Sequence, residues 1–367
     1  MNDRIHPLIT LSNEEKGNFM SVKKLLSVTI AAGALVAGLS VNAQARDLTV
    51  VGWGGASQEV HRNVYFEPFS KKSGVALTED SYNGGLAKIK AMVDTNSVTW
   101  DALLVEAPEL LRGCENGLFE PMAWDKIGKK DDFIDAAVSD CGVGSYVWSI
   151  ALAYDGDVLK DGPKSWADFW DVKKFEGKRG MRKGAKFNLE IALMADGVAP
   201  GDVYEVLGTP EGQKRAFAKL DALKEHIQWW EAGAQPPEWL ASGDVVMTTA
   251  YNGRITNANK EGKNFQISWD GQIYAVDSWA VVKGSENKDK AFDFVAFASA
   301  KDNQAKFPEG IPYGVTNKGA IAALPEALGN QLPTAEANLK NALANDTEFW
   351  IDFEDELNER FNSWAAK

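Results

Sequence analysis

Two charged residues stand where a charge requires a partner. Asp277 interrupts the otherwise apolar run 275–279, and a buried carboxylate is costly unless a cation or hydrogen-bond donors satisfy it. We expect that partner to be a bound ligand, with backbone amides as the alternative. Arg254 closes the segment Tyr251-Asn-Gly-Arg254, and its planar guanidinium suits a carboxylate. The alternative for Arg254 is an exposed position at the start of a helix.

Few residues are arranged for catalysis. Beyond residue 45 the histidines are His61 and His226. Neither belongs to a His-x-x-x-His pattern, and no Gly-x-Ser-x-Gly or Cys-x-x-Cys segment occurs. An exported glycosidase with paired carboxylates stays an alternative without a motif, as does a metal-transport receptor. We therefore predict a protein that is not an enzyme, with no catalytic residue, no metal site and no cofactor.

Strands and helices alternate along the first third of the chain. Runs of β-forming residues at 48–53, 75–78 and 101–105 predict strands, and the segments between them have helical periodicity. This alternation is typical of a parallel α/β sheet, in which ligands bind at the carboxyl ends of the strands.

Three candidate ligand residues follow these strands, namely Trp53, Asn83 and Glu106. We expect them to face one crevice, because the carboxyl ends of parallel strands meet at one edge of a sheet. Trp53 has a place in the core as its alternative, and Glu106 could only cap the helix that it opens. Ser57 is expected to cap the helix that follows Trp53.

Two long β runs, at 146–154 and 272–282, predict two strands that cross between domains. A chain of this length normally forms more than one core, since single cores stop growing near ~250–300 residues. We predict an α/β protein with a discontinuous lobe 1 (46–149 plus 275–367) and an inserted lobe 2 (150–274). Two connections form a hinge, and ligands prefer domain interfaces.

Residues 1–45 have the pattern of a secretory leader. Lys23 and Lys24 precede the apolar run 25–41, which ends at the small-residue site Ala43-Gln44-Ala45. We expect cleavage after Ala45 and export to the periplasm, with Met20 as an alternative start. A retained membrane anchor is disfavoured, because a bilayer requires roughly 20 apolar residues.

The composition adds three constraints. A formal net charge of −13 disfavours nucleic acid and anionic lipid as partners. The two cysteines, Cys114 and Cys141, are predicted to form a disulfide in an oxidising compartment, with two buried thiols as the alternative. The chain has 13 tryptophans, and some of them could serve as cation–π platforms for a ligand.

Several short segments point together to a family by their order and spacing. They are 48–53, 100–105, 117–121, 250–254, Asp277-Ser278 followed by 287–291, and 311–314. Along the whole chain beyond the leader, the sequence resembles the extracellular solute-binding proteins of ABC importers, in the spermidine/putrescine-binding branch. The resemblance implies the type II fold, in which two α/β lobes joined by a two-strand hinge close on a small solute and deliver it to a membrane permease.

The resemblance also implies roles for individual residues. Asp277 matches a carboxylate that binds the amine of the ligand, and Trp53, Tyr251 and Tyr313 match aromatic wall residues. However, segment 181–187 reads Met-Arg-Lys-Gly-Ala-Lys-Phe where polyamine binders are expected to be acidic. Lys183 and Lys186 in it could instead form a solvated face.

Arg254 would repel a polyamine. Tyr-Asn-Gly-Arg followed by Asp277 resembles the γ-aminobutyrate-binding branch, in which Arg254 would hold a carboxylate and Asp277 an ammonium. We therefore predict a monomeric receptor for γ-aminobutyrate or a related ω-amino acid, with a polyamine as the alternative ligand. The lobes are expected to close once the solute neutralises both charges.

Overall fold

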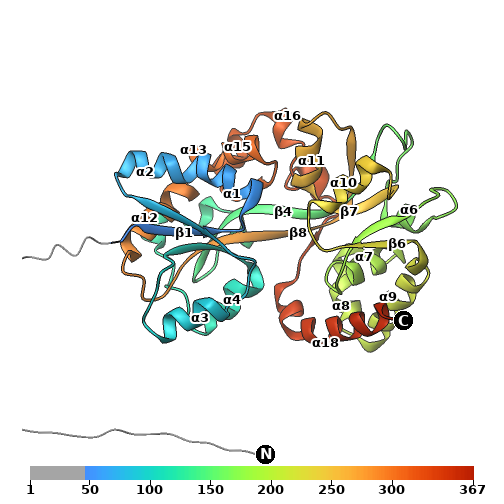
Figure 1. The fold of residues 1–367 in the computed structure, drawn as a ribbon, viewed down its shortest axis with the longest axis horizontal. Coiled ribbons are helices and arrows are strands. Elements are labelled where there is room, and N and C mark those ends of the chain that lie inside the picture. The colour runs from blue at the N-terminus through green and yellow to red at the C-terminus, as the bar shows by residue number, and fades with distance from the viewer. Residues whose placement is uncertain (1–45) are drawn as a thin grey trace, which may run out of the picture. The chain divides into compact units, whose positions relative to one another are not determined.

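A mixed sheet of ten strands runs through residues 46–367, the part of the chain that the computed structural model describes (Figure 1). The predicted leader, its cleavage site and the alternative start lie outside the described residues. The main path of the sheet is β2-β1-β3-β8-β4-β7-β5-β6, with β9 paired to β4 and β10 paired to β8. The strands are β1 Leu48–Gly52, β2 Leu77–Ser81, β3 Ala102–Glu106, β4 Gly142–Asp155, β5 Arg179–Arg182, β6 Ile227–Trp230, β7 Met247–Tyr251, β8 Phe265–Val281, β9 Gly314–Val315 and β10 Leu343–Ala344.

Helices connect these strands and cover the sheet. The α-helices are α1 Gly55–His61, α2 Glu67–Ser73, α3 Ala87–Asp94, α4 Ala107–Glu115, α5 Trp124–Ile127, α6 Trp166–Trp170, α7 Asn188–Ala195, α8 Val203–Leu207, α9 Pro210–Asp221, α10 Gln235–Ser242, α11 Asn252–Lys260, α12 Lys288–Ser299, α13 Lys301–Gln304, α14 Phe307–Gly310, α15 Lys318–Ala323, α16 Glu326–Gly329, α17 Glu336–Leu339 and α18 Thr347–Ala365. A π-helical segment, Arg62–Phe66, joins α1 to α2. Within residues 46–367, no helix is long and apolar enough to cross a membrane.

The long strands β4 and β8 connect two sets of parallel strands. β1 is parallel to β2 and β3, while β5 is parallel to β6 and β7. Between these sets, β4 and β8 pair with each other in the antiparallel direction from Gly142↔Ala280 to Asp155↔Phe265. They match the two crossing strands predicted from the sequence and confirm the α/β class. The predicted residue bounds of the lobes stay a prediction.

The predicted cap at Ser57 is wrong. Helix α1 begins at Gly55, its N-cap position is Gly54, and no side chain caps it. Gly54 and Gly55 both have positive φ, 70° and 59°, a conformation that glycine adopts without steric cost. The turn after β1 therefore ends early enough that Ser57 lies inside the first helical turn.

The C-terminal helix α18 packs on elements that the sequence analysis assigned to lobe 2, although its own residues were assigned to lobe 1. Trp350 Nε1 donates to Glu190 Oε1 on α7 at 2.7 Å, and Trp364 Nε1 donates to Asp221 Oδ1 on α9 at 2.6 Å. Figure 1 shows α18 beside α8 and α9. α18 also contacts α4, where Arg112 donates to Ile351 O at 3.0 Å, so this helix contacts helices that follow strands of both sets.

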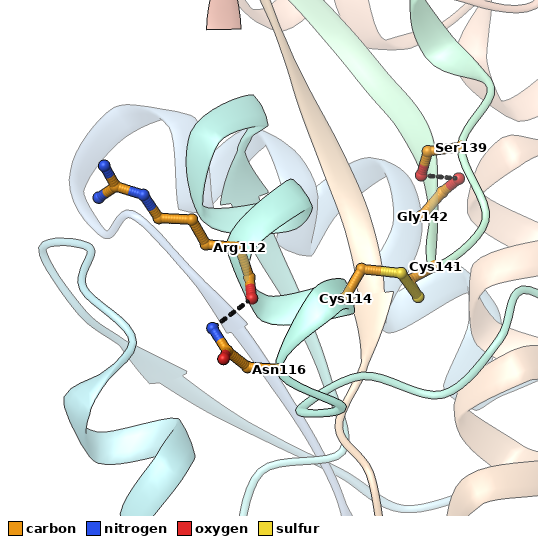
Figure 2. Close-up of a disulfide and its surroundings, with 6 residues drawn as sticks. All are labelled: Arg112, Cys114, Asn116, Ser139, Cys141 and Gly142. Carbon is orange, nitrogen blue, oxygen red and sulfur yellow. Dashed lines mark hydrogen bonds between the residues drawn. A yellow bond between two sulfur atoms is a disulfide. The ribbon is translucent and has the colours of Figure 1, made fainter. Parts of the chain in front are cut away.

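Cys114 and Cys141 form the predicted disulfide, with their Cα atoms 5.7 Å apart (Figure 2). The bond joins the last turn of α4 to the residue that precedes β4. It therefore ties a helix that follows β3 to the start of a crossing strand.

Candidate functional site

A cavity of about 200 Å³ lies where the carboxyl ends of β1, β3 and β7 meet the crossing strands. Both strand sets contribute residues to it, as expected for a site between lobes. Six of the seven predicted ligand residues line it, and Asn83 is the exception. The lining residues are Trp53, Gly54, Ser57, Glu106, Tyr146, Trp148, Gly233, Tyr251, Arg254, Asp277 and Tyr313.

Asp277 is 3% exposed and accepts hydrogen bonds from three aromatic side chains. Trp53 Nε1 and Tyr146 Oη donate to Oδ2 at 2.7 and 2.6 Å, and Trp148 Nε1 donates to Oδ1 at 2.7 Å. Its protein partners are therefore side-chain donors and not the backbone amides considered as an alternative. None of the three donors carries a positive charge.

This environment changes the acidity of Asp277. Burial and, second, the nearby negative charge of Glu106 raise the pKa of the Asp277 carboxyl to about 7, against the opposing effect of the three donors. The Asp277 carboxylate thus has three neutral donors and, within the described chain, no cation to balance its charge. The ammonium group of a ligand in the cavity would provide that positive charge.

Strand register explains why these groups meet. Asp277 on β8 pairs with Glu106 at the end of β3 and with Tyr146 on β4. Trp148 lies two residues beyond Tyr146, and residues two apart on a strand point to the same face. β8 therefore places the buried carboxylate between a second acid and two aromatic donors.

Aromatic pairs form much of the cavity wall. Trp53 stacks on Tyr82 with ring centroids 4.9 Å apart, and Tyr146 stacks on Tyr313 at 5.3 Å. Trp148 meets Tyr251 edge to face at 5.4 Å. Electron-rich ring faces attract cations, so these walls complement the carboxylate of Asp277.

The segment Tyr251-Asn-Gly-Arg254 crosses from β7 into α11, and its second and third residues hold it in place. Asn252 accepts from Ser149 N at 3.1 Å and donates to Pro312 O at 2.7 Å. Gly253 leaves room for Tyr313, because a Cβ atom there would lie 2.6 Å from Tyr313 Cε1. The amide fixes the turn and the glycine admits an aromatic wall.

Arg254 lies in the first turn of α11 and is half-buried at the cavity. Among the described residues, no carboxylate lies within ion-pair distance of Arg254, and its guanidinium donates no hydrogen bond to protein. The alternative of a merely exposed helix-start residue does not describe this position. A guanidinium fork without a protein partner is available to a ligand carboxylate.

Glu106 and Asn83 occupy different surroundings. Glu106 lines the cavity at the N-cap position of α4, where its side chain makes no capping bond. Asn83 is exposed and lies outside the lining of this cavity. Its neighbour Tyr82 turns inward instead and supports Trp53.

Sequence reasoning missed several lining residues, among them Tyr146 and Trp148. Both fall in the predicted run 146–154, and their spacing of two was the available signal. Ser57 also lines the cavity, where its buried hydroxyl has no hydrogen-bond partner among the described residues.

The histidines lie apart from any metal-binding arrangement. His61 is fully buried between aromatic rings, and burial lowers its pKa to about 3. His226 is half-buried in a short 3₁₀ turn. Within residues 46–367, no group of three or more His, Cys, Asp or Glu side chains is placed to hold a metal ion.

Two solved structures resemble the fold. A GABA receptor, Atu4243, has a TM-score of 0.79 and 33% sequence identity, over 88% of this chain and 98% of the receptor. The protein MotA of A. tumefaciens B6, solved with glucopine, has a TM-score of 0.78 and 29% identity, over 87% of this chain and 100% of MotA. These similarities confirm the predicted two-lobed α/β fold.

Sequence comparison gives the family. The gamma-aminobutyric acid-binding protein of Pseudomonas aeruginosa is 54% identical over 328 residues, which cover 89% of this chain and 93% of that protein. The spermidine/putrescine-binding periplasmic protein of Escherichia coli is 23% identical over 343 residues, covering 89% and 94%. A family model described as bacterial extracellular solute-binding protein matches residues 65–337. The chain therefore belongs to the bacterial extracellular solute-binding proteins.

Proposed function

We propose that this protein is the periplasmic substrate-binding component of an ABC importer and captures γ-aminobutyrate or a related ω-amino acid. The observation that carries the proposal is one cavity lined by both Arg254, whose guanidinium has no partner within residues 46–367, and the buried carboxylate of Asp277, which has no cation beside it there. A relative with 54% identity is named as a gamma-aminobutyric acid-binding protein, which supports the same ligand class.

The chemistry of the cavity assigns each end of such a ligand. An ammonium beside Asp277 gains a charge-assisted hydrogen bond and contact with ring faces. A carboxylate at Arg254 gains the planar fork. The volume of about 200 Å³ is below the roughly 300–1,000 Å³ of sites for drug-sized ligands. A short methylene chain between the two charges suits this space.

A polyamine is the alternative ligand. The spermidine/putrescine-binding relative is 23% identical, and both ends of a polyamine are cationic. Arg254 would then face a like charge, which destabilises binding. The unpaired arginine therefore favours the zwitterion.

Hinge closure is the mechanism we propose. β4 and β8 connect the strand sets, so bending them would move Tyr251 and Arg254 relative to Trp53 and Asp277. Closure buries both charges, which is costly unless a ligand neutralises them. The zwitterion thus favours the closed state selectively, and a permease would recognise that state.

Two refinements accompany this mechanism. We assign α18 to lobe 2 on the basis of its contacts with α7 and α9. Lobe 1 then contains the strands and helices on the side of β1, β2 and β3, and its last stretch of chain ends after β10, before α18 begins. A monomer suffices for this function.

A thermal-shift screen of the mature protein tests the ligand class. The compounds are γ-aminobutyrate, 5-aminovalerate, β-alanine, putrescine, spermidine and common α-amino acids. A ligand that binds only the folded state raises the melting temperature, so we expect stabilisation by ω-amino acids. Stabilisation by putrescine or spermidine alone would refute the proposed ligand.

Two variants test the assigned ends. Arg254→Ala and Asp277→Asn should each weaken γ-aminobutyrate binding by about 10- to 100-fold, since each removes a charged hydrogen-bond partner. Arg215→Ala is the matched control, because Arg215 pairs with Asp196 at 2.6 Å and lies outside the cavity lining. Calorimetric titration gives the dissociation constants. Unchanged affinity in either site variant would show that the site is misassigned.

A further inference from the structure

A second arginine lies beside the cavity wall. Arg182 ends β5, which runs parallel to β7 with Gly180 opposite Thr248. Both strands therefore end at the same edge of the sheet, where β7 ends at Tyr251. Burial raises the pKa of Tyr251, and the positive charge of Arg182 opposes that rise. Arg182 is therefore close to the wall residue that precedes the Arg254 turn.

The loop after Arg182 is held in an unusual conformation. Phe187 is buried with φ at 73°, a strained region that a residue with a side chain rarely adopts. Asn188 closes the loop by donating from Nδ2 to the carbonyls of Arg182 and Gly184. Strain of this kind persists where surrounding contacts over-determine the backbone.

The same loop contacts the cavity wall. Phe187 meets Trp148 edge to face with centroids 5.9 Å apart, and the Arg182 guanidinium carbon lies 5.7 Å from the Phe187 ring centroid. Trp148 lines the cavity and donates to Asp277. Arg182 is thus fixed on an aromatic platform next to the site.

Arg182 has no counter-charge among residues 46–367. In the part of the chain that the structure describes, no carboxylate pairs with Arg182, whereas the next residue, Lys183, pairs with Glu231 at 2.8 Å. Two guanidinium groups, those of Arg182 and Arg254, therefore flank Tyr251, and neither pairs with an anion of the described chain. Burying either group on closure requires an anion from elsewhere.

We propose that Arg182 is a second carboxylate-binding residue, which acts with Arg254 on the carboxylate end of the ligand and determines specificity against diamines. This inference rests on the proposed function. A carboxylate has two oxygens with about four acceptor positions, so it can accept from both forks. A diamine places an ammonium beside two cations instead of one.

Two ligands that differ only at the carboxylate end isolate the contribution of Arg182 to carboxylate binding. γ-Aminobutyrate carries the carboxylate, and 4-aminobutanamide replaces it with a neutral amide while keeping the ammonium. In calorimetric titrations, Arg182→Met should weaken γ-aminobutyrate binding about 10- to 100-fold and leave amide binding within about threefold of the parent. Arg182→Lys should lie between the two, because it keeps the charge and loses the fork.

Lys183→Met is the matched control. It removes the same charge from the next residue, whose side chain is about half exposed and already paired, so affinity should stay within about threefold. The melting temperatures of the ligand-free variants report folding. If Arg182→Met does not fold, Arg182→Lys provides the test instead. It should lose more affinity for γ-aminobutyrate than for 4-aminobutanamide.

Three outcomes would overturn the inference. If Arg182→Met binds γ-aminobutyrate as tightly as the parent protein does, Arg182 does not contact the ligand. Equal losses for the acid and the amide would mean that Arg182 only supports the wall. If the parent itself binds no ω-amino acid, the proposed function fails along with this inference, whereas the first two outcomes leave that function standing.

Discussion

Trp53 and Asp277 lie 224 residues apart in the sequence, and the indole of Trp53 donates to the Asp277 carboxylate at 2.7 Å. The bond joins the end of the first strand to a crossing strand. It belongs to a set of three neutral donors that hold a buried carboxylate in place before a ligand arrives. Such preorganisation lowers the cost of binding a cation.

Ligand affinity should depend on pH through Asp277. Its pKa of about 7 in the ligand-free protein is raised by burial and by Glu106, so the carboxyl binds a proton below pH 7. A ligand ammonium favours the ionised form, and binding therefore releases protons. We expect affinity for γ-aminobutyrate to be constant near pH 8 and to fall by up to about tenfold per unit below pH 7.

Calorimetric titration in buffers of different ionisation enthalpy measures this proton release directly. Asp277→Asn provides the control, since it cannot exchange a proton at this position. A dissociation constant that does not change between pH 8 and pH 5 would contradict the expected linkage.

The sequence predicted Asp277 and Trp53 for the site but not the other two donors to Asp277, for a physical reason. An isolated charge in an apolar strand signals a site locally. Tyr146 and Trp148 become donors only through the register of β4 against β8, and register depends on pairing between distant segments. The strand–helix alternation, by contrast, is local, and it gave the α/β class.

Asn83 and the C-terminal helix show the same limit. The position of Asn83 after β2 suggested that it faces the crevice, yet the loop turns Tyr82 inward, where its ring stacks on Trp53. The periodicity of α18 predicted an amphipathic helix and could not indicate which lobe its apolar face covers. That depends on partners such as Glu190.

Gly253→Ala should weaken binding without unfolding the protein. The added Cβ atom would lie 2.6 Å from Tyr313 and 2.9 Å from Ile311, so the aromatic wall must shift. Overpacking of this kind costs about 1–3 kcal/mol, and we expect a comparable loss in affinity for γ-aminobutyrate, about 5- to 150-fold. Gly329→Ala is the control, because nothing lies within 4 Å of its added Cβ. Equal affinities of the two variants would exclude a steric role for Gly253.

Removing the disulfide should destabilise the protein while leaving the site intact. Cys114 and Cys141 are 27 residues apart, and a closed loop of that size stabilises by about 3–4 kcal/mol on the chain-entropy model. We expect C114A/C141A to lose that much free energy of unfolding in urea and to bind γ-aminobutyrate with nearly the parent affinity, since neither cysteine lines the cavity. A large loss of affinity with unchanged stability would show that the disulfide supports the binding site and not the stability of the fold.

Glu190 should make the ligand-free protein less stable as pH rises. It is fully buried on α7, where Oε1 accepts from Trp350 at 2.7 Å and from Tyr204 at 3.1 Å, while Oε2 has no partner among the described residues. Burial raises its pKa to about 7. A raised pKa in the folded state contributes stability that is fully present below the unfolded value, near 4.5, and is lost as pH rises through about 7.

The Glu190→Gln variant lacks this titration. From pH 5 to pH 7, its free energy of unfolding should therefore increase relative to that of the parent. The limit is about 1.4 kcal/mol per pH unit. Urea unfolding of both proteins at several pH values measures the difference. Glu225→Gln serves as the control, because Glu225 is exposed. A difference between Glu190→Gln and the parent that stays constant with pH would mean that Glu190 keeps its charge in the folded protein, held by Trp350 and Tyr204.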